Sequence, residues 1–228
     1  MANAGIVLLA RHASVRLPGK ALAPLGTRPI LDHCLRRLAG ARVGPLVLAT
    51  TTRPEDDALA LLAASLGVPV HRGSTRDVLR RTLEAAEAHG FDLVIRATGD
   101  NPAVDSDAPA RVLAHLEADG ADYACEAGLP VGAGVEAVTR TALARCAAEA
   151  SDAADREHVT TFIKRDTTRY RVVQAAAPVA LRRPDIRLTV DTPDDLAYLR
   201  RLFAWAGGEQ PTLSRLIQAA ETAAVEVA

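Results

Sequence analysis

Short apolar runs alternate with longer amphipathic stretches through the first half of the chain. Five apolar runs are predicted to be strands, and they cover residues 5–10, 46–50, 68–71, 93–98 and 121–125. The stretches between them predict helices over residues 30–39, 55–66, 76–89 and 107–118. Strands that alternate with helices form a mostly parallel sheet with helices on both faces. Continuous apolar runs fit such a sheet, because its strands are buried on both sides. The sequence therefore predicts an α/β fold.

The alternation of apolar runs and amphipathic stretches ends at a glycine- and proline-rich stretch, residues 128–134. A helical region over residues 140–164 and a strand near residues 170–174 follow it, and we expect this part to leave the sheet as a small arm at about residues 128–175. A last strand is predicted at residues 186–190, and the last helices at residues 194–205 and 212–225. The whole of residues 1–228 is expected to form a single domain that includes the arm.

Charge and composition exclude several classes of protein. The 27 lysines and arginines nearly balance the 28 acidic residues, which gives no case for a nucleic-acid or anionic-membrane binder. Only 3% of the residues are aromatic, too few for platforms that stack bases. Cys34, Cys125 and Cys146 lack the C-x-x-C spacing of zinc or redox sites, so we expect them to be reduced core thiols.

The N-terminal residues indicate where in the cell the protein is expected to reside. The first four residues carry no basic side chain, and the apolar run after them is too short for a signal peptide or a membrane span. We therefore expect a cytoplasmic protein with no membrane partner.

Three cations surround a Pro-Gly turn directly after the first predicted strand. Arg11, Arg16 and Lys20 would line the loop at the carboxyl edge of the sheet, where open α/β sheets bind ligands. Guanidinium groups grip phosphate oxygens with two parallel hydrogen bonds, and an ammonium acts as a point charge. A Walker A loop would need glycine at Ser14 and serine or threonine at Ala21. The alternatives left are a phosphate-binding loop and a solvated surface turn.

Two aspartates follow predicted strands from distant parts of the sequence. Asp100 comes after residues 93–98, and Asp191 comes after residues 186–190. Mg²⁺ binds proteins through one or two carboxylates together with substrate phosphates. The pair beside the cationic loop therefore predicts a magnesium site, although Asp191 ahead of Thr-Pro also fits a helix cap or turn.

Several strings together resemble the sugar-acid cytidylyltransferases, which include CMP-Kdo synthetase and acylneuraminate cytidylyltransferase. They are A-R-x-x-S-x-R-L-P-G-K at 10–20, R-G-S-x-x-D-V-L-x-R at 72–81, T-G-D-N-P at 98–102, R-E-H-V-T at 156–160 and V-D-T-P-D-D-L at 190–196. The resemblance is strongest to the spore-coat polysaccharide biosynthesis branch and extends over about residues 5–203.

This resemblance implies a nucleotide-diphospho-sugar transferase fold of the Rossmann-like GT-A type. It also implies transfer of CMP from CTP to a hydroxyl of a sugar acid or similar small acceptor, with Mg²⁺ and release of pyrophosphate. The arm would contribute to a homodimer and to acceptor binding. Nucleic acid and membranes are not expected as partners.

The resemblance also assigns roles to individual residues. The catalytic group would be Lys20, Arg11 and Arg16, and the metal would be held by Asp100 and Asp191. The nucleotide-binding residues would be Leu9, Ala10, Arg11, Ser14, Arg16, Lys20, Arg72, Ser74, Asp77, Thr98 and Asp100. The acceptor-binding residues would be Glu136, Arg156 and His158, with His158 either a base or a structural side chain.

Two positions depart from the pattern of the resemblance. Leu9 stands where relatives have glutamine or proline, and Gly134 stands where relatives have an aspartate ahead of Val-Glu. These departures keep other functions open: a GTP-using enzyme, a phosphonate- or polyol-phosphate-specific nucleotidyltransferase, or a noncatalytic nucleotide-binding domain.

Overall fold

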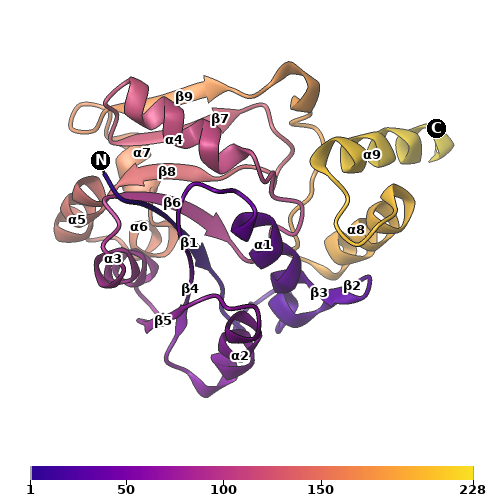
Figure 1. The fold of residues 1–228 in the computed structure, drawn as a ribbon, viewed down its shortest axis with the longest axis horizontal. Helices are drawn as coiled ribbons and strands as arrows, with labels where there is room; N and C mark the ends of the chain where they lie inside the picture. Colours follow the sequence, from indigo (N-terminus) through magenta and orange to yellow (C-terminus); the bar gives the residue numbers. More distant parts are fainter. Residues whose placement is uncertain (1, 228) are drawn as a thin grey trace.

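A seven-stranded sheet runs through the centre of the computed structural model, which describes residues 2–227 without the side chains of residues 224–227. The strand order is β5-β4-β1-β6-β8-β7-β9, and β8 alone among these strands runs antiparallel to its neighbours (Figure 1). The strands are β1 Ala4–Leu9, β4 Leu46–Thr51, β5 Val70–Gly73, β6 Leu93–Thr98, β7 Tyr123–Ala127, β8 Glu136–Thr139 and β9 Val172–Ala176. A short hairpin, β2 Pro24–Leu25 and β3 Arg28–Pro29, lies outside the sheet.

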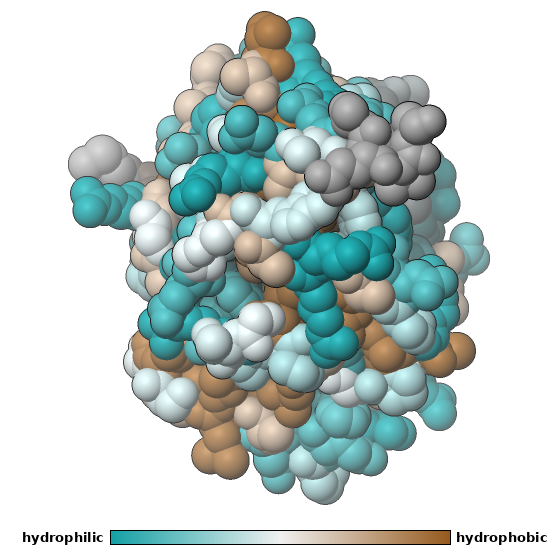
Figure 2. Space-filling model, turned by 90° about the vertical axis from the view of Figure 1, so that its right-hand side faces the viewer, coloured by the Kyte–Doolittle hydropathy of each residue, from teal (hydrophilic) through white to brown (hydrophobic). Residues whose placement is uncertain are grey.

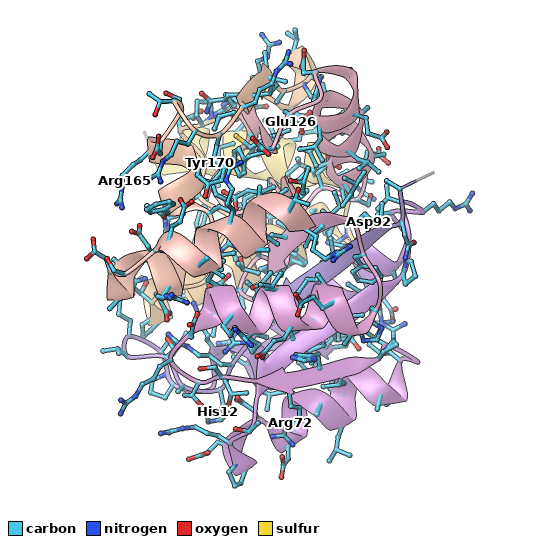
Figure 3. The ribbon with its side chains drawn as sticks, turned by 90° about the vertical axis from the view of Figure 1, so that its left-hand side faces the viewer. His12, Arg72, Asp92, Glu126, Arg165 and Tyr170 are labelled. Atoms are coloured by element: carbon cyan, nitrogen blue, oxygen red, sulfur yellow. The ribbon has the colours of Figure 1, made fainter. Side chains whose placement is uncertain are left out.

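Helices cover both faces of this sheet. Their bounds are α1 Ile30–Ala39, α2 Asp57–Ser65, α3 Val78–Ala88, α4 Ala108–Ala118, α5 Arg140–Glu149, α6 Ala153–His158, α7 Thr161–Arg165, α8 Pro193–Ala206 and α9 Leu213–Val227. One apolar core lies under α1, α2, α4, α8 and α9, and a second lies under α3 and α5. Figure 3 faces α3 and α5, which lie side by side on their face of the sheet. The mostly parallel α/β fold is therefore confirmed.

Local sequence explains where the helices that border the candidate site begin. Asp77 caps α3 because its side chain accepts a hydrogen bond from the backbone N–H of Arg80. Thr192 and Asp195 form a reciprocal capping box at the start of α8. Asp191 is therefore not the cap of α8, and its side chain is available for other contacts.

Most of the predicted elements match the structure to within a few residues. The strands predicted at 46–50 and 93–98 are β4 and β6, and the helix predicted at 30–39 is α1. The predicted helix at 55–66 begins as a short 3-10 turn, Pro54–Asp56, before α2. Cys34 and Cys146 are buried free thiols, whereas Cys125 is half-buried.

Three expectations for the second half of the chain are wrong. Residues 128–175 do not form an arm separate from the sheet, because β8 inserts between β6 and β7 and β9 pairs with β7. The helical region at 140–164 is divided into α5, α6 and α7. Residues 186–190 do not form a strand; their backbone bonds to Val131 and Asp100, which lie in loops, so they make only an isolated bridge.

Five large apolar side chains are exposed in the described part of the chain: Val15, Leu61, Val131, Val179 and Trp205. Figure 2 faces α8, α9 and the β2–β3 hairpin, and its apolar side chains lie in separate groups among polar ones. No helix in the described part of the chain combines the length and apolar character needed to span a bilayer.

Candidate active site

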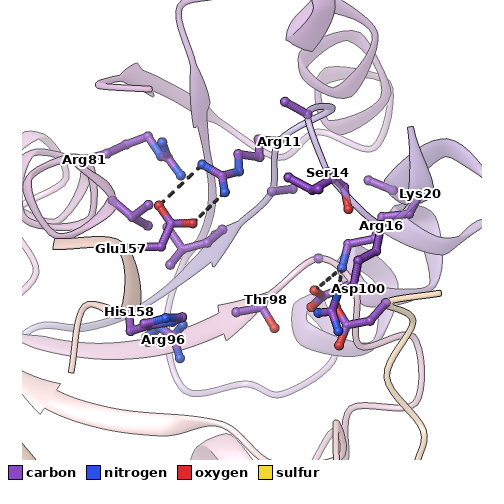
Figure 4. A pocket seen from close by; sticks show the side chains of 18 residues that line it. Arg11, Ser14, Arg16, Lys20, Arg81, Arg96, Thr98, Asp100, Glu157 and His158 are labelled. Carbon is purple, nitrogen blue, oxygen red and sulfur yellow. Dashed lines mark hydrogen bonds and ion pairs between the residues drawn. The ribbon is translucent and has the colours of Figure 1, made fainter. Parts of the chain in front are cut away.

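A cavity of about 370 Å³ opens at the carboxyl ends of β1 and β6 (Figure 4). Its walls come from the loop after β1, the end of β6, the start of α3, the end of α6 and the segment before α8. The residues that line it are Leu9, Ala10, Arg11, Ala13, Ser14, Val15, Arg16, Lys20, Ala21, Val78, Arg81, Arg96, Thr98, Gly99, Asp100, Glu157, His158 and Asp191. The cationic loop, Asp100 and Asp191 thus meet at one site.

Backbone contacts fix the shape of the loop after β1. Gly19 donates its backbone N–H to the carbonyl of His12 at 3.0 Å, and its φ of 71° lies in the left-handed region that favours glycine. The backbone N–H of His12 donates to the buried carboxylate of Asp56 at 2.6 Å. The loop is therefore closed at its base, with its cations on the side of the cavity.

Gly99 at the end of β6 is required by packing inside the protein. A β-carbon added there would lie 2.8 Å from the Cβ of Ala10, and the backbone N–H of Gly99 donates to the carbonyl of Leu9 at 2.8 Å. The small residue brings β6 close to the end of β1, which places Asp100 beside the loop.

Lys20 lies between the two aspartates. Its Nζ is 2.7 Å from Asp100 Oδ2 and 3.0 Å from Asp191 Oδ1, and it also donates to the carbonyl of Val190 at 2.8 Å. Arg16 and Arg187 contact Asp191 at 2.9 and 2.7 Å. We call these five side chains, Arg16, Lys20, Asp100, Arg187 and Asp191, the Lys20 cluster.

The electrostatics of Asp191 follow from these contacts. Burial on its own would raise the pKa of Asp191, but the hydrogen bond from Lys20 and the charges of Lys20 and Arg16 lower it overall. Asp191 is therefore held as a carboxylate in the structure.

Asp100 and Asp191 fit the chemistry of a hard divalent cation. Oxygen atoms of both carboxylates lie within hydrogen-bond distance of one ammonium nitrogen, so a positive charge already occupies the position between them. Among the described residues no third acidic, histidine or cysteine side chain joins them to complete a protein-only metal site. Two carboxylates without further ligands suit Mg²⁺ that is also bound by substrate phosphates.

A second ion pair closes the other side of the loop. Arg11 Nη2 is 2.6 Å from Glu157 Oε1, and Glu157 comes from α6. Figure 4 shows this pair beside Arg81, on the opposite side of the cavity from Lys20 and Asp100. Arg81 is buried, it donates to the carbonyl of Ser74, and burial lowers its pKa.

Five residues expected to bind ligand do not line this cavity: Arg72, Ser74, Asp77, Glu136 and Arg156. Arg72 donates to the carbonyls of Thr51 and Arg53 and to Asp57. The structure places Ser74, Asp77 and Arg156 in one internal network. The hydroxyl of Ser74 accepts from the backbone N–H of Asp77 at 3.0 Å, and Arg156 pairs with Asp77 at 2.8 Å. These contacts join α3 to α6.

Glu136, expected to bind the acceptor, lies behind the cavity wall. Its carboxylate accepts hydrogen bonds from Arg96 at 2.8 Å, Tyr123 at 2.8 Å, Thr160 at 2.9 Å and Lys164 at 3.0 Å. Burial would raise its pKa, but the charges of Arg96 and Lys164 outweigh burial and lower the pKa to about 2. We call these five residues the Glu136 cluster.

Sequence reasoning missed three charged residues of the cavity: Arg81, Arg96 and Glu157. Arg96 left a signal, because it is a lone charge inside the apolar strand at residues 93–98. Arg81 and Glu157 sit in strings that the resemblance quoted, next to the residues that were chosen. Their side-chain directions depend on helix packing that the strings do not contain.

Comparison with known proteins decides the family. The profile described as Cytidylyltransferase matches residues 4–223. The chain belongs to the cytidylyltransferase family. It is 35% identical over 215 residues to the spore coat polysaccharide biosynthesis protein SpsF of Bacillus subtilis, covering 91% of this chain and 89% of that protein. The chain is therefore a nucleotidyltransferase enzyme.

Solved structures of this family share the fold. A cytidylyltransferase from Leptospira borgpetersenii superposes with a TM-score of 0.91 at 26% identity, covering 99% of this chain and 96% of that one. CMP:2-keto-3-deoxy-manno-octonic acid synthetase, solved with CTP, superposes with a TM-score of 0.68 at 20% identity, covering 89% and 99%. The second likeness supports the Rossmann-like nucleotide-sugar transferase fold.

Proposed function

We propose that this enzyme transfers CMP from CTP to a hydroxyl group of a sugar acid or similar small acceptor, with release of pyrophosphate. The observation that carries the proposal is the position of Lys20, 2.7 Å from Asp100 and 3.0 Å from Asp191 inside the cavity. Cations for a triphosphate and carboxylates for a divalent cation converge there from three separate segments. The relative SpsF carries spore coat polysaccharide biosynthesis in its name, which favours a sugar-derived acceptor.

The cationic side chains would bind the triphosphate. Arg11 and Arg16 would grip phosphate oxygens, and Lys20 would follow the charge that develops as pyrophosphate leaves. In the structure these cations are paired with Glu157, Asp191 and Asp100, so phosphate oxygens would replace carboxylates as their partners. The exchange keeps each cation paired while the ligand enters.

The carboxylates would hold the metal. Asp100 and Asp191 would bind Mg²⁺, which when bound supplies neutralisation of phosphate charge. The contribution of the chain to the reaction is then position and electrostatics: it holds the acceptor hydroxyl in line with the α-phosphorus and presents fixed positive charge to the leaving group.

Pyrophosphate release tests the proposal. The enzyme is incubated with Mg²⁺ and CTP, GTP, UTP or ATP in turn, against a panel of 2-keto sugar acids, with small phosphonates as a second panel. Asp100→Ala is the inactive control, and Asp107→Ala is the matched control because Asp107 does not line the cavity. We expect release with CTP and a sugar acid, lost in Asp100→Ala only.

Other results would contradict the proposal in distinct ways. Release with GTP but not CTP would overturn the nucleotide assignment. Release only with phosphonates would overturn the acceptor assignment, and release that survives Asp100→Ala would overturn the site.

A further inference from the structure

Arg96 lines the cavity with a guanidinium group that the protein uses only in part. It comes from β6 and has 19% of its side chain exposed. Its Nη1 donates to Glu136 at 2.8 Å, its Nε is buried without a partner, and its Nη2 makes no hydrogen bond within the described residues. Nη2 is not among the buried atoms, so it can donate a charge-assisted hydrogen bond to a carboxylate in the cavity.

Glu136 fixes the direction of this guanidinium group. Arg96 and Glu136 are directly paired across the antiparallel strands β6 and β8. Tyr123, Thr160 and Lys164 also donate to Glu136 at 2.8 to 3.0 Å, so its carboxylate, which has about four acceptor positions, is fully used by the protein. Glu136 is therefore not free to bind a ligand, and it holds one end of the guanidinium while Nη2 stays unpaired.

A strained turn joins the Glu136 cluster to the cavity wall. Val159 is fully buried and has a φ of 60° and a ψ of −57°, a conformation that a β-branched residue rarely adopts. The backbone N–H of Thr160 donates across this turn to the carbonyl of His158 at 2.6 Å. Thr160 contacts Glu136, and His158 lines the cavity. Strain of this kind gathers at ligand sites, where the surrounding structure maintains it.

The charges at this end of the cavity favour an anionic ligand group. Arg96 and Lys164 are two cations against one carboxylate, Glu136, and the Arg11–Glu157 pair lies on the same side of the cavity beside Arg81. Figure 4 shows Arg96 and His158 apart from Arg16, Lys20 and Asp100, with Thr98 between the two groups. Arg16 and Lys20 therefore lie at the other end of the cavity from Arg96.

We propose that Arg96 binds a carboxylate of the acceptor through its free Nη2 and so determines acceptor specificity, with Glu136 as its positioning residue. This inference rests on the proposed nucleotidyl transfer, and it assigns the acidic group of the acceptor to a residue that no motif singled out. The proposed acceptor is a sugar acid, so its carboxylate is the expected ligand group and phosphate is the competing anion.

Anion binding without nucleotide tests the assignment. The probe is pyruvate, a singly charged 2-keto carboxylate, with inorganic phosphate as the second arm. The Nε–H resonance of Arg96 is assigned from its loss in Arg96→Lys and followed by NMR during each titration. We expect pyruvate to shift this resonance at lower concentration than phosphate, and Arg96→Lys to weaken pyruvate binding roughly tenfold.

Two further variants separate the role of Glu136 from a general structural role. Glu136→Gln should shift the Arg96 resonance without ligand and weaken pyruvate binding, while leaving the affinity for CTP unchanged. Arg111→Lys is the matched control, because Arg111 pairs with Glu126 and Asp105 and does not line the cavity. Should Glu136→Gln fail to fold, Arg96→Lys still decides the assignment.

Three results would overturn the inference: no shift of the Arg96 resonance with pyruvate, equal pyruvate affinity in Arg96→Lys, or tighter binding of phosphate than of pyruvate. Because neither CTP nor turnover enters the pyruvate and phosphate titrations, their failure is separate from a failure of pyrophosphate release.

Discussion

The Lys20 cluster and the Glu136 cluster both set carboxylates against cations beside the same cavity, but Asp100 of the first and Glu136 of the second differ in how fully the carboxylate is used. Asp100 accepts a side-chain hydrogen bond from Lys20 alone among the described residues, and 27% of its side chain is exposed. Glu136 accepts from four side chains, and 16% of its side chain is exposed. The first carboxylate has acceptor positions left for a ligand, and the second has none.

This difference separates binding from positioning. Asp100 has one side-chain donor in the protein and open acceptor positions, so a ligand or metal can bind it when only the contact with Lys20 is exchanged. A carboxylate that is buried and fully hydrogen-bonded is costly to disturb, because each released group loses its partner. The Lys20 cluster can therefore exchange partners when a triphosphate enters, whereas the Glu136 cluster holds Arg96 in one place.

The largest effect is expected in the turnover rate when a residue of the Lys20 cluster is substituted. Lys20→Met should lower turnover by roughly 10²- to 10³-fold, as for the loss of one preorganised charge at a reacting centre. Pyrophosphate release measures the rate, and circular dichroism checks that the fold is kept. Turnover within a few-fold of the unchanged enzyme would remove Lys20 from the reaction.

The second-largest effect is expected in the free energy of unfolding when the Glu136 cluster is disrupted. Glu136→Gln should lower the free energy of unfolding by about 1.5–3 kcal/mol, because it replaces charge-assisted hydrogen bonds and leaves Arg96 and Lys164 without a counter-charge. Urea denaturation measures it. The matched comparison is Arg80→Ala, which breaks an exposed pair with Glu84 and should lower the free energy of unfolding much less. Equal losses in the two variants would contradict the distinction between the clusters.

A smaller, pH-dependent effect follows from the same residue. The pKa of Glu136 is lowered from 4.5 to about 2, so its charge stabilises the folded state fully above pH 4.5. As pH falls from 4.5 towards 2, this contribution is lost, and the stability difference between the unchanged protein and Glu136→Gln should shrink. Denaturation series at several pH values measure that difference. A difference that stays constant over this range would contradict the lowered pKa.

The sequence predicted those features that depend on local pattern. The apolar run at 93–98 and the amphipathic stretch at 30–39 gave β6 and α1 with the same bounds, because each pattern is complete within its own segment. The run at 186–190 has the same apolar character, but its backbone partners are loops, which no local pattern reveals. The strand β8 has only four residues and lies between strands from earlier in the chain, so its place depends on pairing at long range.

The candidate site shows the same limit. The sequence placed Lys20 and Asp100 together, because strand ends meet at one edge of a parallel sheet. Asp191 joins them although the strand predicted before it does not form. The sequence could not say whether a charged side chain has a protein partner or a free donor. Arg72 and Arg96 are both arginines on strands, yet the guanidinium nitrogens of Arg72 are all used by the protein and those of Arg96 are used only in part.

Metal affinity without nucleotide tests the exchange of partners in the Lys20 cluster most directly. Lys20 holds a positive charge between Asp100 and Asp191, so a divalent cation must displace it. Calorimetric titration of Mn²⁺ into the unchanged protein and into Lys20→Met compares the two affinities, with Arg80→Met as the control for loss of a distant cation. We predict roughly tenfold tighter binding of Mn²⁺ in Lys20→Met alone. Equal or weaker binding in that variant would contradict the account.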